Sequence, residues 1–264
     1  MQRIDLQRAQ SANSHPARKD NMTADTSLVR EFAPTGRLRA ALNMGNAVLA
    51  HSRTARERPA GVTVDLARAF AGLLGVEVSF QEYDSAAHSG GALADGLADV
   101  AFLAIDPKRA ERIHFTPPYV EIEGCYLVRN DSPLQDNAAV DQPGTVLVVG
   151  DGSAYELFLS RTLKHARLIK VPTSEEVVQE MLARTDTHAA AGVKQQLQAD
   201  AARLGGVRLL PGRFMVIQQA MAMRRGGSEQ AIAFLDSFIA QQKRTGFVAD
   251  ALARHGIEGA TVAA

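Results

Sequence analysis

The chain has 264 residues, of which 46% are hydrophobic, and its 29 Lys and Arg residues equal its 29 Asp and Glu residues in number. This length allows one large domain or two smaller ones with ordinary globular cores. A net charge near zero argues against a nucleic-acid-binding surface and an electrostatic membrane anchor. Cys125 is the single cysteine, which excludes an intrachain disulfide and a cysteine-based metal cluster. We therefore expect a small molecule or another protein as the partner.

The N-terminal residues 1–30 are polar, and we predict that they form a disordered tail. They contain no apolar run of the length that a secretory signal needs, and Met22 is an alternative start. No run of about 18 apolar residues occurs, so we expect no insertion into a membrane.

The first half of the remaining chain alternates predicted strands and helices. Period-two or continuous apolar runs predict strands over residues 36–43, 76–80 and 100–105. Helical spacing predicts helices over residues 63–75 and 86–98, and Gly75 is suited to end the first of them. Strands that alternate with helices in this way are typical of a parallel α/β fold.

A second α/β unit follows a polar loop over residues 129–144 and begins with a predicted strand at 145–150. Ser153 and Thr173 are each followed three residues later by Glu, which predicts two capping boxes, and Ser228 is expected to cap a later helix. Extended segments at 120–127 and 214–223 connect the units. We predict lobe 1 over residues 31–123 and 219–258, lobe 2 over residues 124–218, and a ligand-binding cleft between them.

Two elements, one in each unit, are suited to bind an anion. Arg109 follows the buried strand 100–105, where a fixed guanidinium matches a carboxylate, although a solvated turn is the alternative. The segment Gly150–Ala154 leads into a helix, whose free N–H groups favour negative charge. It lacks the Gly-Lys-Ser/Thr ending of a phosphate loop. Arg109 and this helix start, facing each other across a cleft, would fit one carboxylate.

Patterns for catalysis or metal binding are weak. The seven His residues are scattered, and neither HExxH nor Gly-x-Ser-x-Gly occurs. Cys125 lies in an apolar segment and is expected to be a core residue. Glu121 and Glu123 share one face of a strand and are either an acid/base pair, an ammonium partner or a solvated face. We predict no catalytic residue, no metal and no cofactor.

With these residues in view, the chain resembles the family-3 extracellular solute-binding proteins, the polar amino-acid receptors of ABC importers. The resemblance covers roughly residues 34–257 and rests on Gly61–Ala67, Asp99–Phe102, Arg109 with Ile113–Tyr119, Gly150–Ala154 and the closing helices. It implies a two-lobed α/β type II periplasmic-binding-protein fold with a two-strand hinge. It also implies a ligand trapped by closure, and a return of the chain to lobe 1 after the second hinge strand.

The resemblance also implies roles for individual residues. Arg109 matches the arginine that binds the ligand α-carboxylate. Ser153 and Ala154, together with Gly152, match the second-lobe segment whose backbone binds the same carboxylate. Asn46 and Ala104 match cleft-facing positions of the first lobe.

Three features depart from the family pattern, and one of them is the missing signal peptide. The segment before the arginine, which usually supplies hydroxyl groups, reads Phe102–Asp106. The acid that usually meets the ligand ammonium is absent near residues 192–194. Either Asp106 or Glu123 replaces that acid, or a second anionic group of the ligand meets Lys194.

We therefore expect a monomeric solute-binding protein, not an enzyme, that traps an amino acid or related carboxylate for uptake through an ABC transporter permease. The resemblance implies a periplasmic location, although the chain shows no signal peptide. One alternative is an enzyme that resembles the cyclohexadienyl dehydratases, with Glu121 or Glu123 as general acid. Another is a cytoplasmic ligand sensor that contacts a second protein.

Overall fold

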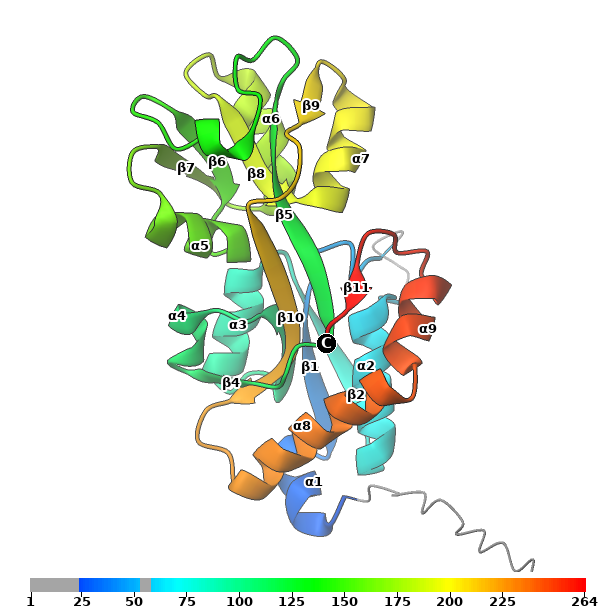
Figure 1. Cartoon of the computed structure of the whole chain (residues 1–264). Helices are drawn as coiled ribbons and strands as arrows, with labels where there is room; N and C mark the ends of the chain where they lie inside the picture. Colours follow the sequence, from blue (N-terminus) through cyan, green and yellow to red (C-terminus); the bar gives the residue numbers. More distant parts are fainter. Residues whose placement is uncertain (1–23, 53–57) are drawn as a thin grey trace, which may run out of the picture.

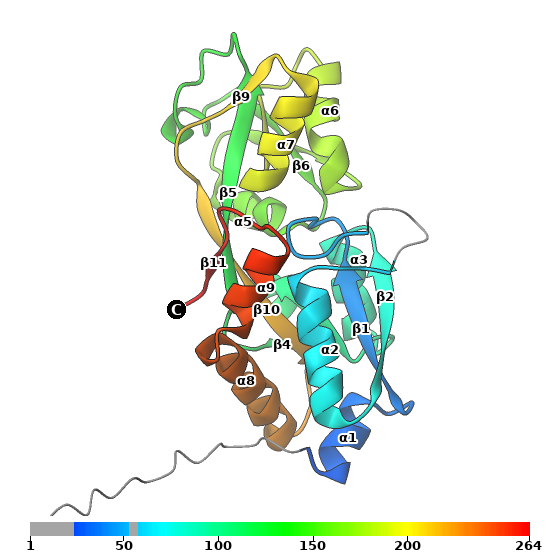
Figure 2. The ribbon, with the colours of Figure 1, turned by 90° about the vertical axis from the view of Figure 1, so that its right-hand side faces the viewer.

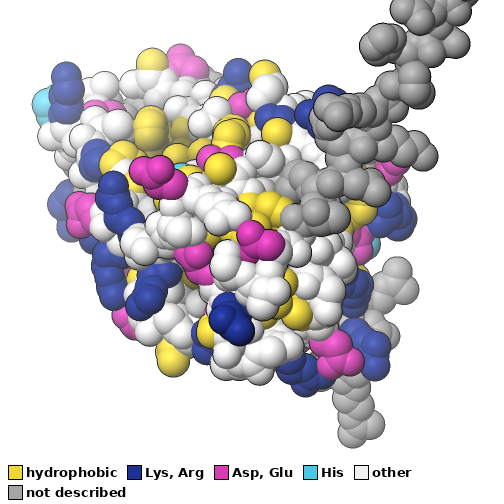
Figure 3. Space-filling model, turned by 90° about the horizontal axis from the view of Figure 1, so that it is seen from below, with side chains coloured by type: hydrophobic (Ala, Val, Ile, Leu, Met, Phe, Trp, Pro, Cys, Tyr) yellow, Lys and Arg dark blue, Asp and Glu magenta, His cyan; other side chains and the backbone are white. Residues whose placement is uncertain are grey.

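The computed structural model describes residues 24–52 and 58–264. It consists of two α/β lobes placed end to end and joined by long strands (Figure 1). Seen from below, the surface of the lower lobe mixes basic with acidic side chains (Figure 3). Within the described residues, no helix combines the length and the apolar character needed to cross a membrane.

Lobe 1 is built on a sheet with the strand order β2-β1-β3-β10. Its parallel part consists of β1 (Arg37–Asn43), β2 (Glu77–Tyr83) and β3 (Val100–Ala104). The connections between these strands are the helices α2 (Val62–Leu74) and α3 (Ala86–Ala94). Gly75 ends α2 with φ of 70°, as predicted. The alternation of strands and helices predicted for this half is confirmed.

The last helices of the chain return to lobe 1, as the resemblance implied. Figure 2 shows α8 (Glu229–Arg244) and α9 (Phe247–Arg254) beside α2. Phe238 of α8 packs its ring 4.9 Å from that of Phe70 of α2. Leu235, Phe238 and Ile239 of α8 are buried here. The predicted cap at Ser228 is confirmed, because its hydroxyl oxygen accepts a hydrogen bond from the Ala231 N–H at 3.1 Å.

A short helix, α1 (Thr26–Phe32), occupies the end of the segment predicted to be disordered. Residues 1–23 of that prediction lie outside the described residues, whereas for 26–30 it is wrong. Leu28 and Phe32 are buried, and the Phe32 ring lies 5.0 Å from that of Phe70. Asp25 caps the helix by accepting from two backbone N–H groups. The segment is polar on average, but its apolar residues Leu28 and Phe32 pack against other parts of lobe 1 in the folded protein.

Lobe 2 contains a second parallel sheet segment in which β6 (Val146–Gly150) pairs with β7 (Arg167–Val171) and β8 (Ala189–Val193). Its helices are α5 (Ala154–Thr162), α6 (Val177–Ala183) and α7 (Lys194–Leu204). Half of the capping box predicted at Ser153 is confirmed, because the Ser153 hydroxyl oxygen accepts from the Glu156 N–H at 3.1 Å. The reciprocal bond is not formed, since the Ser153 N–H donates to the Gly150 carbonyl oxygen. The cap predicted at Thr173 is wrong: a 3-10 turn, η2 (Ser174–Glu176), precedes α6, and the Thr173 side chain makes no capping bond.

Two long antiparallel strands, β5 (Val120–Arg129) and β10 (Met215–Arg224), form the hinge. The strand β10 pairs with β3 in lobe 1, while β5 pairs with β8 and with β9 (Val207–Leu209) in lobe 2. Short strands complete both edges, with β4 (Ile113–Phe115) on β10 and β11 (Thr261–Val262) on β5. The lobe boundaries at 123/124 and 218/219 stay a prediction.

After β3 the chain forms a short helix, α4 (Pro107–Ala110), which carries Arg109. Pro107 occupies the start of this helix, where its fixed φ suits the helical backbone. An N–H group at this position would have no acceptor within the helix, so proline costs no hydrogen bond there. Asp106 precedes it and accepts a hydrogen bond from the Lys108 N–H at 2.9 Å. This turn of helix sets the position of Arg109 at the edge of the cleft.

Candidate ligand-binding cleft

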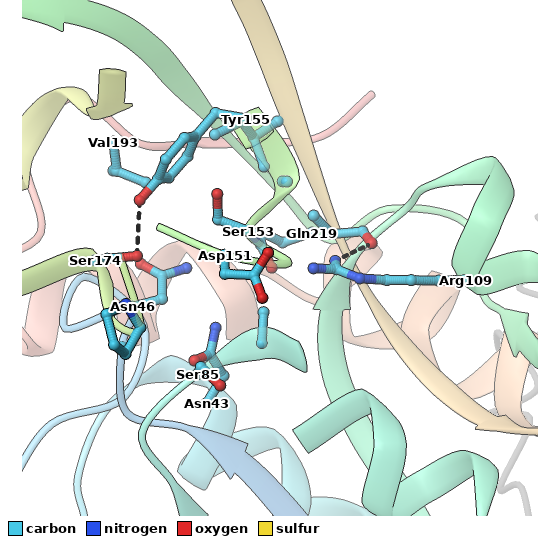
Figure 4. A pocket seen from close by; sticks show the side chains of 16 residues that line it. Asn43, Asn46, Ser85, Arg109, Asp151, Ser153, Tyr155, Ser174, Val193 and Gln219 are labelled. Atoms are coloured by element: carbon cyan, nitrogen blue, oxygen red, sulfur yellow. Dashed lines mark hydrogen bonds between the residues drawn. The ribbon is translucent and has the colours of Figure 1, made fainter. Parts of the chain in front are cut away.

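A cavity lies between the lobes, beside the hinge strands (Figure 4). Its empty space, counted with the open mouth, is about 470 Å³. Its walls come from the ends of β1, β3, β6, β7 and β8, from the turns that follow them and from β10. The lining residues are Asn43, Gly45, Asn46, Ser85, Ala86, Ala104, Arg109, Asp151, Ser153, Ala154, Tyr155, Pro172, Ser174, Val193, Ile217 and Gln219.

Arg109 reaches from lobe 1 to lobe 2. One of its terminal nitrogens donates to the Ala104 carbonyl oxygen at 2.9 Å, and the other donates to the Gly152 carbonyl oxygen at 2.7 Å. Burial lowers the pKa of Arg109 to about 10, opposed by the charges of Asp106 and Glu156, so the guanidinium stays cationic at neutral pH. Since both acceptors are neutral carbonyl groups, the positive charge is available to an anion in the cleft.

The start of α5 faces the same space. Gly152 adopts φ of 62°, which turns the chain from β6 into the helix, and the buried Ser153 side chain caps it. The first N–H groups of a helix have no acceptor within the helix, and its dipole places partial positive charge at this end. Arg109 and this helix start therefore give one side of the cleft a positive potential.

Tyr155 and Ser174 form a further part of the lobe 2 wall. The Tyr155 hydroxyl donates to the Ser174 hydroxyl oxygen at 2.8 Å, and burial raises the pKa of Tyr155. Figure 4 shows this pair on the far side of the cavity from Arg109. Sequence reasoning missed both residues, together with Asn43, Ser85, Asp151 and Gln219. Asn43 could have been found, because it stands at the carboxyl end of a parallel strand, where ligands of such sheets bind.

Six of the nine residues predicted to bind the ligand lie at this site. Arg109, Ala104, Asn46, Ser153 and Ala154 line the cavity, and the Gly152 carbonyl is the acceptor for Arg109. These residues are distant in sequence, and the approach of the lobes brings them together. Their roles in ligand binding stay predictions.

The other three predicted residues have partners of their own and are not part of the cavity wall. Asp106 is buried and accepts a hydrogen bond from Arg161 of α5 at 2.7 Å. Lys194 donates to Glu123 at 2.7 Å, and Arg213 donates to the other Glu123 oxygen at 2.7 Å. The carboxylates of Asp106 and Glu123 are thus each paired with cations from distant parts of the sequence.

The same contacts bear on a general-acid role for Glu123. Hydrogen bonds from Lys194 and Arg213 lower the pKa of Glu123 below its usual value. A general acid that acts at neutral pH needs the opposite shift. Glu121 faces Gln218, whose amide donates to it at 3.1 Å. In the part of the chain that the structure describes, no group of His, Cys, Asp and Glu side chains is arranged to hold a metal ion.

Comparisons with known proteins identify the family and the fold of the chain. The family model of the bacterial extracellular solute-binding proteins, family 3, matches residues 44–257. Membrane-bound lytic murein transglycosylase F of Maricaulis maris is 36% identical over 100 residues, which are 37% of this chain and 22% of that protein. The match thus spans about a fifth of that relative's length.

Among solved structures, a putative binding component of an ABC transporter from Wolinella succinogenes, complexed with lysine, superposes with a TM-score of 0.70. It is 24% identical, and the superposition covers 83% of this chain and 95% of that one. An ancestral amino-acid-binding protein, described as a precursor of cyclohexadienyl dehydratase, also gives 0.70, at 21% identity over 86% of this chain and 98% of that one. These likenesses show the type II periplasmic-binding-protein fold. With the family model matching most of its length, the chain belongs to the bacterial extracellular solute-binding proteins, family 3.

Proposed function

We propose that this protein binds an amino acid or a related small carboxylate between its lobes and delivers it to an ABC transporter permease. The observation that carries the proposal is the position of Arg109. Its guanidinium is bound only to the carbonyl oxygens of Ala104 and Gly152 within the described residues, and it stands next to the start of α5. A carboxylate in the cleft would meet a permanent cation and free backbone N–H groups at once.

Closure of the lobes explains how such a ligand is retained and reported. Arg109 contacts both lobes, so a carboxylate that binds it stabilises the closed arrangement over an open one. A permease that recognises the closed arrangement would then distinguish loaded from empty protein. The Wolinella succinogenes protein, a putative ABC transporter component in complex with lysine, supports this use of the fold.

Further parts of the proposal follow from the family. We place the protein outside the cytoplasm, in the periplasm, as a monomer with lobe 1 at residues 31–123 and 219–258 and lobe 2 at 124–218. The ligand-contacting residues are Arg109, Ala104 and Asn46 from lobe 1, and Gly152, Ser153 and Ala154 from lobe 2. Fractionation of the untagged protein checks the location, because a cytoplasmic sensor would leave its pool in the cytoplasm.

Calorimetry tests the role of Arg109. The protein is unfolded in guanidinium chloride, dialysed, refolded and titrated with each of the common amino acids. For any that binds, Arg109→Met is expected to lower the affinity about 100-fold, since hydrogen bonds to a charged group contribute up to about 3 kcal/mol. Arg112→Met is the matched control, because Arg112 is exposed and pairs with Asp95. An unchanged affinity in Arg109→Met would contradict the proposal.

A dehydratase-like enzyme is the second candidate function, and the likeness to the ancestral amino-acid-binding protein supports its consideration. It requires a general acid in the cleft, whereas Glu123 is held ionised by Lys194 and Arg213. Turnover of prephenate or arogenate, measured on the refolded protein, would establish the enzyme. Tight amino-acid binding without turnover is the result that we expect.

A further inference from the structure

The acids that the sequence offered as partners of a ligand ammonium group have other counter-ions in the structure. Asp106 pairs with Arg161 at 2.7 Å, and its side chain is 3% exposed. Glu123 pairs with Lys194 and with Arg213, each at 2.7 Å, so Lys194 is engaged as well. Neither carboxylate lines the cavity. A cationic group of the ligand must therefore meet a different acid if it is to keep a counter-charge when the lobes close.

Asp151 is the acid that lines the cavity, among the residues that the structure describes. It lies in the turn between β6 and α5, directly before Gly152. Its side chain is 60% exposed, and Figure 4 shows its carboxylate directed into the space between the lobes. A ligand in the cleft can therefore contact the carboxylate oxygens of Asp151 directly, which the buried Asp106 does not allow.

Lys170 is the protein cation beside Asp151, but it mainly compensates another carboxylate. Its Nζ lies 3.3 Å from Asp151 Oδ1 and 2.8 Å from Glu156 Oε1. The side chain of Glu156 is 3% exposed, so it depends on Lys170 for compensation of its charge, whereas Asp151 is open to water. The hydrogen bond to Glu156 is also the largest cause of the raised pKa of Lys170. Asp151 thus retains negative charge that a ligand can use.

The charges that line the cavity are balanced. In the described part of the chain, the charged lining residues are Arg109 and Asp151. Arg109 donates to two neutral carbonyl oxygens, so its charge is available to an anion. A ligand with a carboxylate but no cation would close the cleft over Asp151 without compensating the carboxylate for its lost hydration. One positive and one negative charge on separate residues therefore match a ligand that carries both charges.

We propose that Asp151 binds a cationic nitrogen of the ligand and thereby restricts the cleft to zwitterions. The proposal rests on the proposed function, in which the ligand carboxylate binds Arg109 and the start of α5. The cationic nitrogen is either the α-ammonium group or a cationic group of the ligand side chain. Both sources share the chemistry that Asp151 recognises, and the probes below distinguish them.

The sheet of lobe 2 explains how Asp151 can replace the acid that is absent near residues 192–194. Those residues lie at the carboxyl end of β8, and Asp151 follows the carboxyl end of β6. The two strands are parallel neighbours, so their carboxyl ends meet at the same edge of the sheet. Asp151 therefore stands one strand away from the expected position and faces the same cleft.

Calorimetry on the refolded protein compares amino acids with analogues that lack one cationic nitrogen. The probes are the common L-amino acids and, for each that binds, the L-2-hydroxy acid with the same side chain, as L-lactate for L-alanine. L-Norleucine and L-citrulline replace L-lysine and L-arginine without the side-chain cation. The analogue that lacks the nitrogen bound by Asp151 is expected to bind about 30-fold more weakly. That ratio corresponds to about 2 kcal/mol, as expected for a hydrogen bond to a charged group.

Variants assign this discrimination to the Asp151 carboxylate. Asp151→Asn keeps the shape of the side chain and removes its charge. It is expected to lower the affinity for the amino acid about 30-fold without lowering the affinity for the analogue, so the ratio between the two disappears. Asp186→Asn is the matched control, because Asp186 also belongs to lobe 2, is 54% exposed and pairs with Arg184 at 2.9 Å, but does not line the cavity. Thermal melting confirms that each variant folds.

The outcomes separate this inference from the proposed function. A weaker 2-hydroxy acid assigns Asp151 to the α-ammonium group, and a weaker norleucine or citrulline assigns it to the side-chain cation. Analogues that all bind as tightly as the amino acid would overturn the inference, and so would an unchanged ratio in Asp151→Asn. In both cases a loss of affinity in Arg109→Met would still support a carboxylate-binding protein. An affinity that does not depend on Arg109 contradicts the proposed function itself, and binding of none of the amino acids overturns both.

Discussion

The buried Asp106 carboxylate of lobe 1 accepts a hydrogen bond from Arg161 of α5 at 2.7 Å, so an ion pair joins the lobes beside the cleft. Asp106 also caps α4, the helix that carries Arg109. The side chain of Asp106 is 3% exposed and that of Arg161 is 43% exposed, so the bond is partly shielded from water. An opening of the cleft would break this pair together with the bond from Arg109 to Gly152.

Arg161→Ala is expected to destabilise the closed form and thereby weaken ligand binding. The loss is about 1 kcal/mol because Arg161 is partly exposed, which corresponds to about fivefold in affinity. Arg203→Ala removes a similar arginine, which pairs with Asp200 inside α7 at 2.6 Å, and is expected to leave affinity unchanged. Calorimetry with the best-binding amino acid measures both. Equal losses in the two variants would show that the ion pair does not act on closure.

Gly152→Ala is expected to hinder closure. An added Cβ would lie 2.6 Å from the Cβ of Ala87 on α3, in the opposite lobe, so the lobes must separate. Overpacking of this kind costs about 1–3 kcal/mol, and affinity should fall roughly 5- to 150-fold.

Gly144→Ala provides the matched control for that variant. Gly144 has φ of 88°, so alanine there suffers similar backbone strain, but nothing lies within 4 Å of its added Cβ. Small-angle scattering should show a larger radius of gyration for Gly152→Ala alone in saturating ligand. A compact Gly152→Ala protein with normal affinity would contradict the predicted contact between the lobes.

Asp141→Asn is expected to lower the melting temperature in a pH-dependent manner. Asp141 accepts hydrogen bonds from the backbone N–H groups of Lys164, His165 and Ala166, which lower the pKa of its carboxyl to about 2. Since the folded-state pKa lies below the unfolded value near 3.8, the carboxylate stabilises the fold above pH 4. This contribution is lost as the pH falls toward 2.

Melting curves of the Asp141→Asn variant and the unmodified protein between pH 2.5 and 7 check this expectation. The difference in melting temperature should be constant at neutral pH and shrink on acidification. Asp131→Asn, at an exposed position of the same lobe, is the control and should show little difference at any pH. A difference for Asp141→Asn that grows on acidification would contradict the assigned sign.

Much of the fold follows from local sequence signals. The strands β3 and β6 are apolar runs, and β1 alternates apolar with polar residues in its first half. Gly75, Ser153 and Ser228 end or begin their helices as predicted. These signals depend on backbone geometry and on nearby residues, which the sequence displays directly. Helix α1 was missed because its stability comes from aromatic contacts with residues far along the chain.

Less of the site could be predicted from the sequence, because it too depends on contacts between residues far apart in the chain. Arg109 could be singled out because it follows a buried strand and matches a family motif. The partners of Asp106 and Glu123 could not, since Arg161 is 55 residues from Asp106 and Lys194 is 71 residues from Glu123. Ion pairs across the cleft and the hinge are set by how the lobes meet, which no local pattern encodes.

Native mass spectrometry of the protein as purified tests the central claim most directly. The account predicts that the unmodified protein and Arg112→Met carry a bound small molecule with the mass of an amino acid, whereas Arg109→Met carries none. Release of this molecule by denaturation identifies it. The same adduct on Arg109→Met, or its absence from the unmodified protein, would contradict a cleft that holds a carboxylate through Arg109.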